Sequence, residues 1–315
     1  MYENCVPKTT KMKPWIVLVL TGFALVETTA KEDPPCTHAT KQTALYLNYV
    51  WSKNEDPRIL PATSVSVEHR WTNTSDLERF GKNGIFAAHP IEIGEDAAKI
   101  GGYFGSQADG SPGAGGLLFS IWDSIRQDQR FRTNTPNATW SQHRHAFPLS
   151  PSCQRHCLDC GLHPGWHNTT GVQCSVPMHV RSNDTIVFNL TRIATNQTLI
   201  NPLGMELHYV GDIWELIATN KTSMKVTNVG KMFLEDVHVG LTRFGAFHEH
   251  IGCVPCDSFY ESETRVGPFA IQPGNRTVQS ISFQRDKNVS CQLFDVKTLN
   301  DMYPPEALIS TGPGT

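Results

Sequence analysis

The feature that most constrains this chain is a long succession of short apolar runs, rich in β-branched and aromatic residues and bounded by turn-forming residues. In Thr185–Arg192 (TIVFNLTR), alternation places Ile186, Phe188 and Leu190 on one face of an extended strand. No long segment repeats its apolar residues with the helical period. Many short strands at this spacing are typical of a sandwich or a jelly roll. We therefore predict an all-β, antiparallel β-sandwich or jelly roll.

The stretch Lys99–Asp123 (KIGGYFGSQADGSPGAGGLLFSIWD) is predicted to form the centre of this fold. Two aromatic-bearing apolar segments flank a loop of Ser, Asp, Pro and Gly, which is the pattern of two strands and their connection. Trp122 shares a strand face with Leu118, so core packing explains it at least as well as ligand contact does. The loop Ser106–Gly116 is the part expected to be free to face a partner.

Two strand boundaries are predicted from turn and breaker residues. Met205–Tyr209 and Ile213–Thr219 both alternate, and Gly211 with Asp212 lies between them where a hairpin turn is expected. In the run GIFAAHPIEI, Pro90 is predicted to break the strand because proline cannot donate to a central ladder.

The N-terminus has the parts of a secretory signal: two lysines, an apolar run from Trp15 to Val26, and small residues ending at Ala30. We expect a signal peptide over residues 1–30, with Met12 as an alternative start. An uncleaved anchor is the competing interpretation, although the run is short for a membrane span. No membrane span is expected after cleavage, and the predicted location is secreted, by way of the secretory pathway.

The remaining chain is predicted to be one domain. Residues 31–300 are assigned to a single disulfide-stapled β-sandwich, since such folds commonly exceed about 200 residues as one unit. A polar, Cys/His-rich segment at about 124–174 has poor periodicity and is interpreted as an insertion between the two halves. Residues 301–315 are rich in Pro and Gly and are expected to be a flexible tail.

Cysteine usage agrees with secretion. The chain has nine cysteines, and cleavage after Ala30 would remove Cys5 and leave an even set. Even sets in an oxidising compartment favour disulfides, whose pairing the sequence leaves open. A zinc site in the Cys/His-rich segment is the weaker alternative, so no metal and no cofactor are predicted. The cysteines predicted to form disulfides are Cys36, Cys153, Cys157, Cys160, Cys174, Cys253, Cys256 and Cys291.

Nine N-x-S/T sequons without an intervening proline predict a glycoprotein. An occupied site must face solvent, and Asn189 is the weakest candidate because it falls inside a strand-like run. The predicted sites are Asn73, Asn137, Asn168, Asn183, Asn189, Asn196, Asn220, Asn275 and Asn288.

The segments GGYFGSQ (Gly101–Gln107) and LLFSIWD (Leu117–Asp123) resemble the signatures of an uncharacterised extracellular family, a domain of unknown function with GYFG-x-Q and FS-x-WD motifs. Looser likenesses follow, and together they cover about residues 60–285. The resemblance implies a single antiparallel β-sandwich, similar in outline to lectin-like jelly rolls, and it transfers no reaction. The Cys/His-rich insertion departs from the family pattern. The looser likenesses lie at Thr170–Phe188, Trp214–Ile217, Phe247–Glu249 and Arg265.

Candidate chemistry rests on carboxylates and aromatic rings. Glycoside hydrolysis needs two carboxylates across a cleft, and Glu92, Glu215 and Glu249 are the candidates. Tyr103, Trp166 and Trp214 are candidates to stack on sugar rings, because each has an apolar face and a polar edge.

Charge helps to choose among functions. A net charge of -3, with acidic and basic residues interspersed, argues against nucleic acid as a partner. The leading hypothesis is a secreted, N-glycosylated, disulfide-bonded module that binds an extracellular glycan or glycoprotein. The alternatives are a secreted glycan hydrolase and a structural protein of the surface or matrix.

Overall fold

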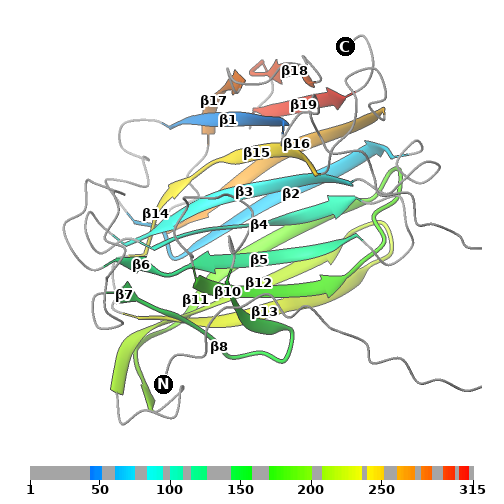
Figure 1. Cartoon of the computed structure of the whole chain (residues 1–315). Coiled ribbons are helices and arrows are strands. Elements are labelled where there is room, and N and C mark those ends of the chain that lie inside the picture. Colours follow the sequence, from blue (N-terminus) through cyan, green and yellow to red (C-terminus); the bar gives the residue numbers. More distant parts are fainter. Residues whose placement is uncertain are drawn as a thin grey trace, which may run out of the picture.

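The computed structural model is a sandwich of two antiparallel sheets (Figure 1). The structure describes residues 43–51, 61–74, 84–94, 100–108, 115–125, 143–157, 170–200, 208–235, 240–251, 261–273, 278–285, 294–301 and 305–311. Within these ranges no helix is long and apolar enough to cross a membrane. The two antiparallel sheets confirm the predicted all-β sandwich.

Sheet A contains nine strands in the described residues, in the order β17-β1-β15-β3-β4-β5-β10-β9, with β14 also paired to β3. Its strands are β1 (Thr43–Trp51), β3 (Gly84–Ile93), β4 (Ile100–Ala108), β5 (Gly116–Trp122), β9 (Cys153–Cys157), β10 (Thr170–Pro177), β14 (Leu241–Phe244), β15 (Ala246–Ile251) and β17 (Val278–Arg285).

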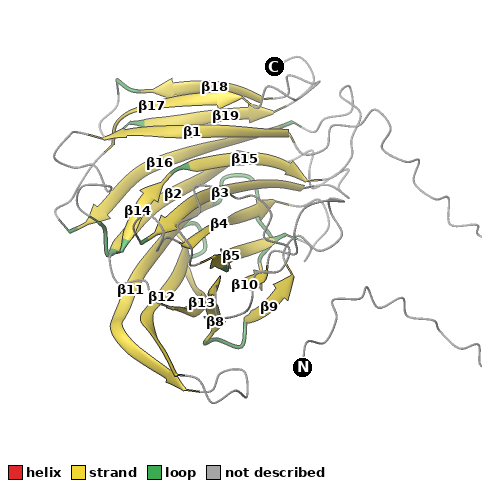
Figure 2. Ribbon diagram, turned by 60° about the vertical axis from the view of Figure 1, so that its left-hand side comes forward, coloured by secondary structure: helices red, strands yellow, loops and turns green. Residues whose placement is uncertain are grey.

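Sheet B contains eight strands in the same part of the chain, in the order β18-β19-β16-β2-β11-β12-β13-β8. A separate pair is made by β6 (Ser124–Ile125) and β7 (His143–Arg144). In Figure 2, the long ribbon of β11 and β12 reaches beyond the other strands. The strands of sheet B are β2 (Ser64–Asn73), β8 (Ala146–Pro148), β11 (Thr185–Ile200), β12 (His208–Asn220), β13 (Lys225–Glu235), β16 (Ser262–Gln272), β18 (Phe294–Leu299) and β19 (Glu306–Thr311).

The core between the sheets follows from alternation. In sheet A, Phe104 of β4 lies opposite Phe119 of β5, and both are fully buried. Phe188 of β11 and Trp214 of β12 are buried on the inner face of sheet B. Burying a large apolar side chain contributes about 2 kcal/mol or more, so this layer holds the two sheets together. The stretch from Lys99 to Asp123 supplies two neighbouring strands of the core, as predicted.

Two predicted strand ends are wrong. β12 runs without interruption through Gly211 and Asp212, because the buried Asp212 carboxylate is satisfied within the sheet. It accepts hydrogen bonds from Arg192 Nη1 at 3.2 Å and from the Asn196 backbone N–H at 3.1 Å, where β11 bulges. β3 likewise continues through Pro90, at the point where its neighbour changes from β14 to β15.

The expected tail and insertion also contribute strands. Residues Glu306–Thr311 form β19, which pairs with β16 and β18 and buries Ala307 and Ile309 by alternation. Within the expected insertion, β8 joins sheet B and β9 joins sheet A. Both segments are too short or too polar to show a clear period, yet β8 and β9 are the last strands of their sheets and β19 lies one strand in from the other end of sheet B.

One disulfide lies within the described residues. It joins Cys153 to Cys174, which are directly opposite each other on β9 and β10. Its sulfurs lie against Gly230 of β13, where an added Cβ would come within 2.4 Å of both Sγ atoms. Glycine at this position therefore lets sheet B approach the disulfide of sheet A. The side chain of Cys157, and all of Cys36, Cys160, Cys253, Cys256 and Cys291, lie outside the described residues.

Candidate functional site

Among the described side chains, four aromatic rings from four adjacent strands lie together on the outer face of sheet A. In β3, Ile85 and Ala87 point into the core, so Phe86 between them points outward. The same alternation turns Tyr103 of β4, Trp122 of β5 and Phe247 of β15 to that face. We call Phe86, Tyr103, Trp122 and Phe247 the aromatic row.

The four rings contact one another. The Tyr103 ring centroid lies 5.1 Å from that of Trp122, 5.3 Å from that of Phe86 and 6.0 Å from that of Phe247. The Phe86 and Phe247 centroids are 5.7 Å apart. All four pairs meet edge to face, which is a favourable geometry for aromatic rings. Phe86 is buried, whereas the other three are half-buried and keep some surface available.

A carboxyl group lies beside this row. Glu249 of β15 is opposite Phe86 in the strand register, on the outer face, whereas its neighbour His248 points into the core. No hydrogen bond or ion pair joins the Glu249 side chain to another described residue. Burial among its neighbours raises the pKa of Glu249 to about 7. This carboxyl group is therefore close to half-protonated at neutral pH.

Glu249, Phe86 and Gln107 lie in one line across β15, β3 and β4. Neighbouring strands are about 4.8 Å apart, so the backbones of Glu249 and Gln107 are separated by about 10 Å with Phe86 between them. A polar group therefore lies on either side of an apolar ring. Such an arrangement can hold a ligand that has an apolar face and hydroxyl groups at its edges.

The three candidate carboxylates are not brought together. Glu92 lies six residues from Phe86 along β3, or about 20 Å, and pairs with Arg243 at 3.1 Å. Glu215 belongs to sheet B, where it pairs with Lys231 at 3.1 Å and accepts a hydrogen bond from Asn228 at 2.5 Å. No two of the three are therefore placed across one cleft, and Glu249 has the raised pKa expected of a general acid.

The three aromatic residues proposed as ligand-binding candidates lie in different parts of the protein. Tyr103 belongs to the aromatic row. Trp214 is fully buried in the core, with its ring about 6.0 Å from the Arg192 guanidinium, and no ligand reaches it in this fold. Trp166 lies outside the described residues. Phe86 and Phe247 were not among the ligand-binding candidates, although their positions between inward-facing residues of alternating strands are a signal that could have identified them.

The sequons differ in exposure. Asn183 and Asn196 are exposed, and Asn73 and Asn189 are half-buried. Asn220 is 8% exposed, and its side-chain oxygen accepts hydrogen bonds from the backbone of the following turn. The other four sequons, at Asn137, Asn168, Asn275 and Asn288, lie outside the described residues.

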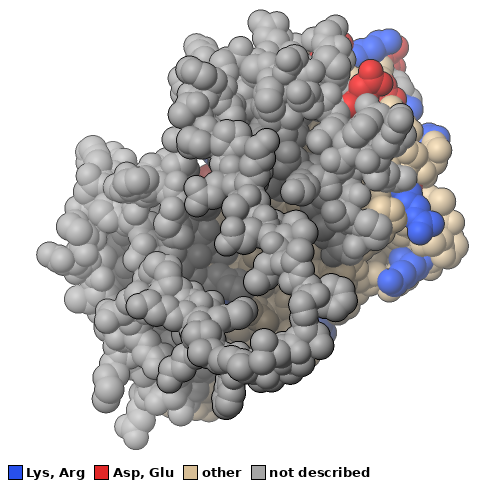
Figure 3. All heavy atoms as spheres, turned by 45° about the vertical axis from the view of Figure 1, so that its right-hand side comes forward, with Lys and Arg blue, Asp and Glu red and all other residues tan. Residues whose placement is uncertain are grey.

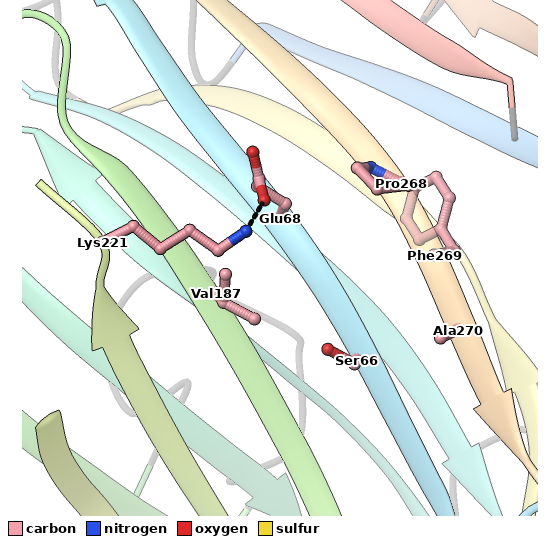
Figure 4. A pocket seen from close by; sticks show the side chains of 7 residues that line it. All are labelled: Ser66, Glu68, Val187, Lys221, Pro268, Phe269 and Ala270. Carbon is pink, nitrogen blue, oxygen red and sulfur yellow. Dashed lines mark hydrogen bonds and ion pairs between the residues drawn. The ribbon is translucent and has the colours of Figure 1, made fainter. Parts of the chain in front are cut away.

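Sheet B offers a shallow pocket on its own outer face, of about 290 Å³, between β2, β11 and β16. Figure 4 shows its two charged side chains, Glu68 and Lys221, directed at each other, and their ion pair measures 2.6 Å. Because these charges satisfy each other, this pocket is a weaker candidate than the aromatic row. On the described surface visible in Figure 3, lysines and arginines are separated by uncharged residues and form no continuous basic area.

Comparisons with known proteins assign no family. No family model matches the chain, and no curated protein matches it. Among solved structures, the chain is similar to one described as "Crystal structure of Scytalido-glutamic peptidase with a peptide based transition state analog". The similarity has a TM-score of 0.38 and 9% identity, and it covers 86% of this chain and 99% of that one. At this level it carries no argument about function.

The core contains a second group of chemistry-bearing residues that the sequence analysis missed. His69, His89 and His248 are buried at 0%, 0% and 1% exposure. In SVSVEHRW, His69 follows Val65 and Val67 on the same strand face, so its inward direction was readable from alternation. Burial lowers the pKa of all three imidazoles, to about 3 for His89 and His248. Within the described ranges, no three His, Cys, Asp or Glu side chains are arranged to hold a metal ion.

Proposed function

We propose that the outer face of sheet A binds an extracellular carbohydrate, free or carried by a glycoprotein, and that the chain works as a secreted binding module. The observation that carries this proposal is the aromatic row, whose rings lie on adjacent strands beside Glu249 and Gln107. Sugar rings combine an apolar face with hydroxyl edges, and this surface combines apolar rings with polar flanks. The secretory signal, sequons and cysteines of the sequence support an extracellular ligand.

Glycan-array binding by the purified, secreted chain tests the proposal. Trp122→Ala and Tyr103→Ala should each weaken binding about tenfold or more, since a well-packed aromatic anchor contributes more than about 1 kcal/mol. Phe283→Ala is the matched control, because Phe283 is an exposed aromatic residue of β17, outside the aromatic row. An array with no bound glycan, or equal loss in the control, would contradict the proposal.

A second candidate function is glycan hydrolysis at the same face. The raised pKa of Glu249 favours it, because a carboxyl group that is partly protonated at neutral pH can act as a general acid. Its second carboxylate is not supplied by Glu92 or Glu215, so a base or nucleophile would have to come from elsewhere in the chain. Turnover of a bound glycan that disappears in Glu249→Gln, while binding persists, would favour the hydrolase over the module.

A further inference from the structure

The three buried histidines connect the two sheets. His69 belongs to β2 of sheet B, whereas His89 and His248 belong to β3 and β15 of sheet A. The ring centroids of His69 and His89 are 4.6 Å apart across the sandwich. A neutral imidazole has one N–H donor and one bare nitrogen acceptor, so each ring has two groups to satisfy in the core.

A continuous chain of hydrogen bonds runs through two of these rings. Trp71 Nε1–H donates to Ser106 Oγ at 3.1 Å, and Ser106 Oγ lies 3.5 Å from His69 Nδ1. His69 Nε2 is hydrogen-bonded to His89 Nε2, and His89 Nδ1 lies 2.8 Å from the Gly245 carbonyl oxygen. This series of hydrogen bonds starts at Trp71 of β2 in sheet B and passes through β4 back to β2. It then crosses to β3 and ends between β14 and β15.

The direction of these bonds assigns the protons. The Gly245 carbonyl can only accept, so His89 carries its proton on Nδ1 and leaves Nε2 bare. His69 must then donate from Nε2, and its Nδ1 accepts from the Ser106 hydroxyl. Both rings are neutral in this arrangement, and every polar side-chain group in this series of hydrogen bonds has a partner. A second added proton would bring two N–H groups face to face between His69 and His89.

The His248 ring lies outside this series of hydrogen bonds. Its Nε2 is buried and has no hydrogen-bond partner among the described residues, and its ring lies 6.3 Å from the Trp71 ring. Protonation of His248 would bury a charge, which costs several kcal/mol without an ion-pair partner. Burial is the largest cause that lowers its pKa, and the charge of His89 is the second.

The elements packed around the cluster offer no compensating charge in the described residues. Among these, the charge interactions that lower the pKa of His69 come from His89 and His248. Tyr49 of β1 packs on Phe244 and Phe269 next to the cluster, and burial keeps it neutral by raising its pKa. The other elements present Ser106 and aromatic rings. The rings are Phe104 of β4, Phe188 of β11, Phe244 of β14 and Phe269 of β16.

We propose that His69, His89 and His248 form an acid-sensitive lock between the two sheets, and that proton uptake below about pH 6 opens the sandwich. The lock is independent of the proposed carbohydrate site. In the unfolded chain, histidines titrate near 6.5. Stability from three imidazoles that stay neutral when folded is thus full above pH 6.5 and is lost as the pH falls.

The size of the effect follows from the count of protons. For each unit by which the pH falls below 6.5, one imidazole that stays neutral in the folded state lowers the folded-to-unfolded ratio about tenfold. Three such imidazoles lower it about a thousandfold per pH unit. Glu249 opposes this trend by about tenfold, because its raised pKa makes the folded state bind a proton between pH 4.5 and about 7. The net expectation near pH 5.5 is uptake of about two protons on unfolding.

Urea unfolding of the full chain at pH 5.0 to 7.5 tests the lock. The logarithm of the unfolding constant should change by about two per pH unit near pH 5.5, and His248→Gln should reduce this slope by about one. His248 is the best site because its buried Nε2 makes no hydrogen bond with the described residues that the substitution would remove. His208→Gln, an exposed histidine of β12, is the matched control and should leave the slope unchanged. A flat wild-type profile, or an unchanged slope in His248→Gln, would overturn the proposal.

A second measurement needs no histidine variant. Calorimetric unfolding in two buffers of different ionisation enthalpy counts the protons taken up by the wild-type chain at pH 5.5. Uptake of about two protons, rising to about three in Glu249→Gln, supports the lock. No net uptake in both chains would refute it even if His248→Gln does not fold.

Discussion

The Glu249→Gln substitution should stabilise this protein at alkaline pH. Glutamine has nearly the same size as glutamate but is neutral at every pH, so it removes only the cost of ionising a half-buried carboxyl group that has no described ion-pair partner. The effect follows from the raised pKa of Glu249, whose folded form holds its proton up to about pH 7.

The magnitude comes from the displacement of this pKa. Moving it from 4.5 to about 7 corresponds, at about 1.4 kcal/mol per pH unit, to about 3 kcal/mol. Glu249 is half-buried, so screening by solvent reduces this value, and we expect about 1–3 kcal/mol at pH 8. For a carboxyl group whose folded pKa is raised, stability is full below the unfolded pKa and is lost as the pH rises through both values. The advantage of glutamine should therefore fade from pH 8 to pH 5.

Paired urea titrations at pH 5, 6, 7 and 8 measure this difference in the free energy of unfolding. Glu215→Gln is the matched control, because Glu215 pairs with Lys231 on the other sheet and its loss should cost less than about 1 kcal/mol. A Glu249→Gln difference that is constant over this range, or that grows toward acid pH, would refute the reasoning. A stabilising substitution at a polar surface position is also a mark of a residue kept for function.

Gly230→Ala should destabilise the fold by about 1–3 kcal/mol in thermal unfolding, because its Cβ would lie 2.4 Å from both disulfide sulfurs. Asp212→Ala should cost about 3–5 kcal/mol by urea unfolding, since it leaves a part-buried arginine without its carboxylate, whereas Glu68→Ala breaks an exposed pair and should cost less than about 1 kcal/mol. Site-specific glycan mapping of the secreted protein should find Asn196 occupied and Asn220 unoccupied, because Asn196 is exposed and Asn220 is 8% exposed with its side-chain oxygen bonded to the backbone.

The alternation of apolar and polar residues along the chain was the pattern that predicted the fold. In β11, Ile186, Phe188 and Leu190 are all fully buried, as their spacing indicated. The turn-rich segment Ser106–Gly116 correctly indicated two strands, β4 and β5, but its ends were misplaced: β4 continues to Ala108, and Ser106 is buried in the core rather than facing a partner. These signals succeed because the direction of a side chain in a strand depends only on its position in the chain.

Strand ends were harder to predict because distant partners decide them. Gly211 and Asp212 have the composition of a turn, yet β12 continues through them, since Arg192 and a bulge in β11 satisfy the Asp212 carboxylate. The segment that forms β19 is short and follows two prolines, and it becomes a strand because β16 offers an edge to pair with. Because both partners are distant in the sequence, the strand propensity of the local segment does not reveal them.

The candidate site was only partly readable for the same reason. Tyr103 was identified by its residue type, but its packing with Phe86 and Phe247 depends on the order of β4, β3 and β15 in the sheet. Glu249 was one of three equal carboxylates in the sequence. Only the fold separates it, because Glu92 and Glu215 have cationic partners, whereas Glu249 is removed from water and has no cationic partner among the described residues.

Adjacent residues on β15 give the protein opposing responses to pH. His248, on the inner face, favours the folded state at higher pH, and Glu249, on the outer face, favours it at lower pH. With His69 and His89 added, the three imidazoles outweigh Glu249 at acid pH, so stability rises up to about pH 7.5 and changes little above it. A ligand that hydrogen-bonds the ionised Glu249 carboxylate would lower its pKa and add stability at neutral and alkaline pH, while the acid limit set by the core imidazoles would not move. The stabilisation by a ligand at the aromatic row should therefore be larger at pH 8 than at pH 5.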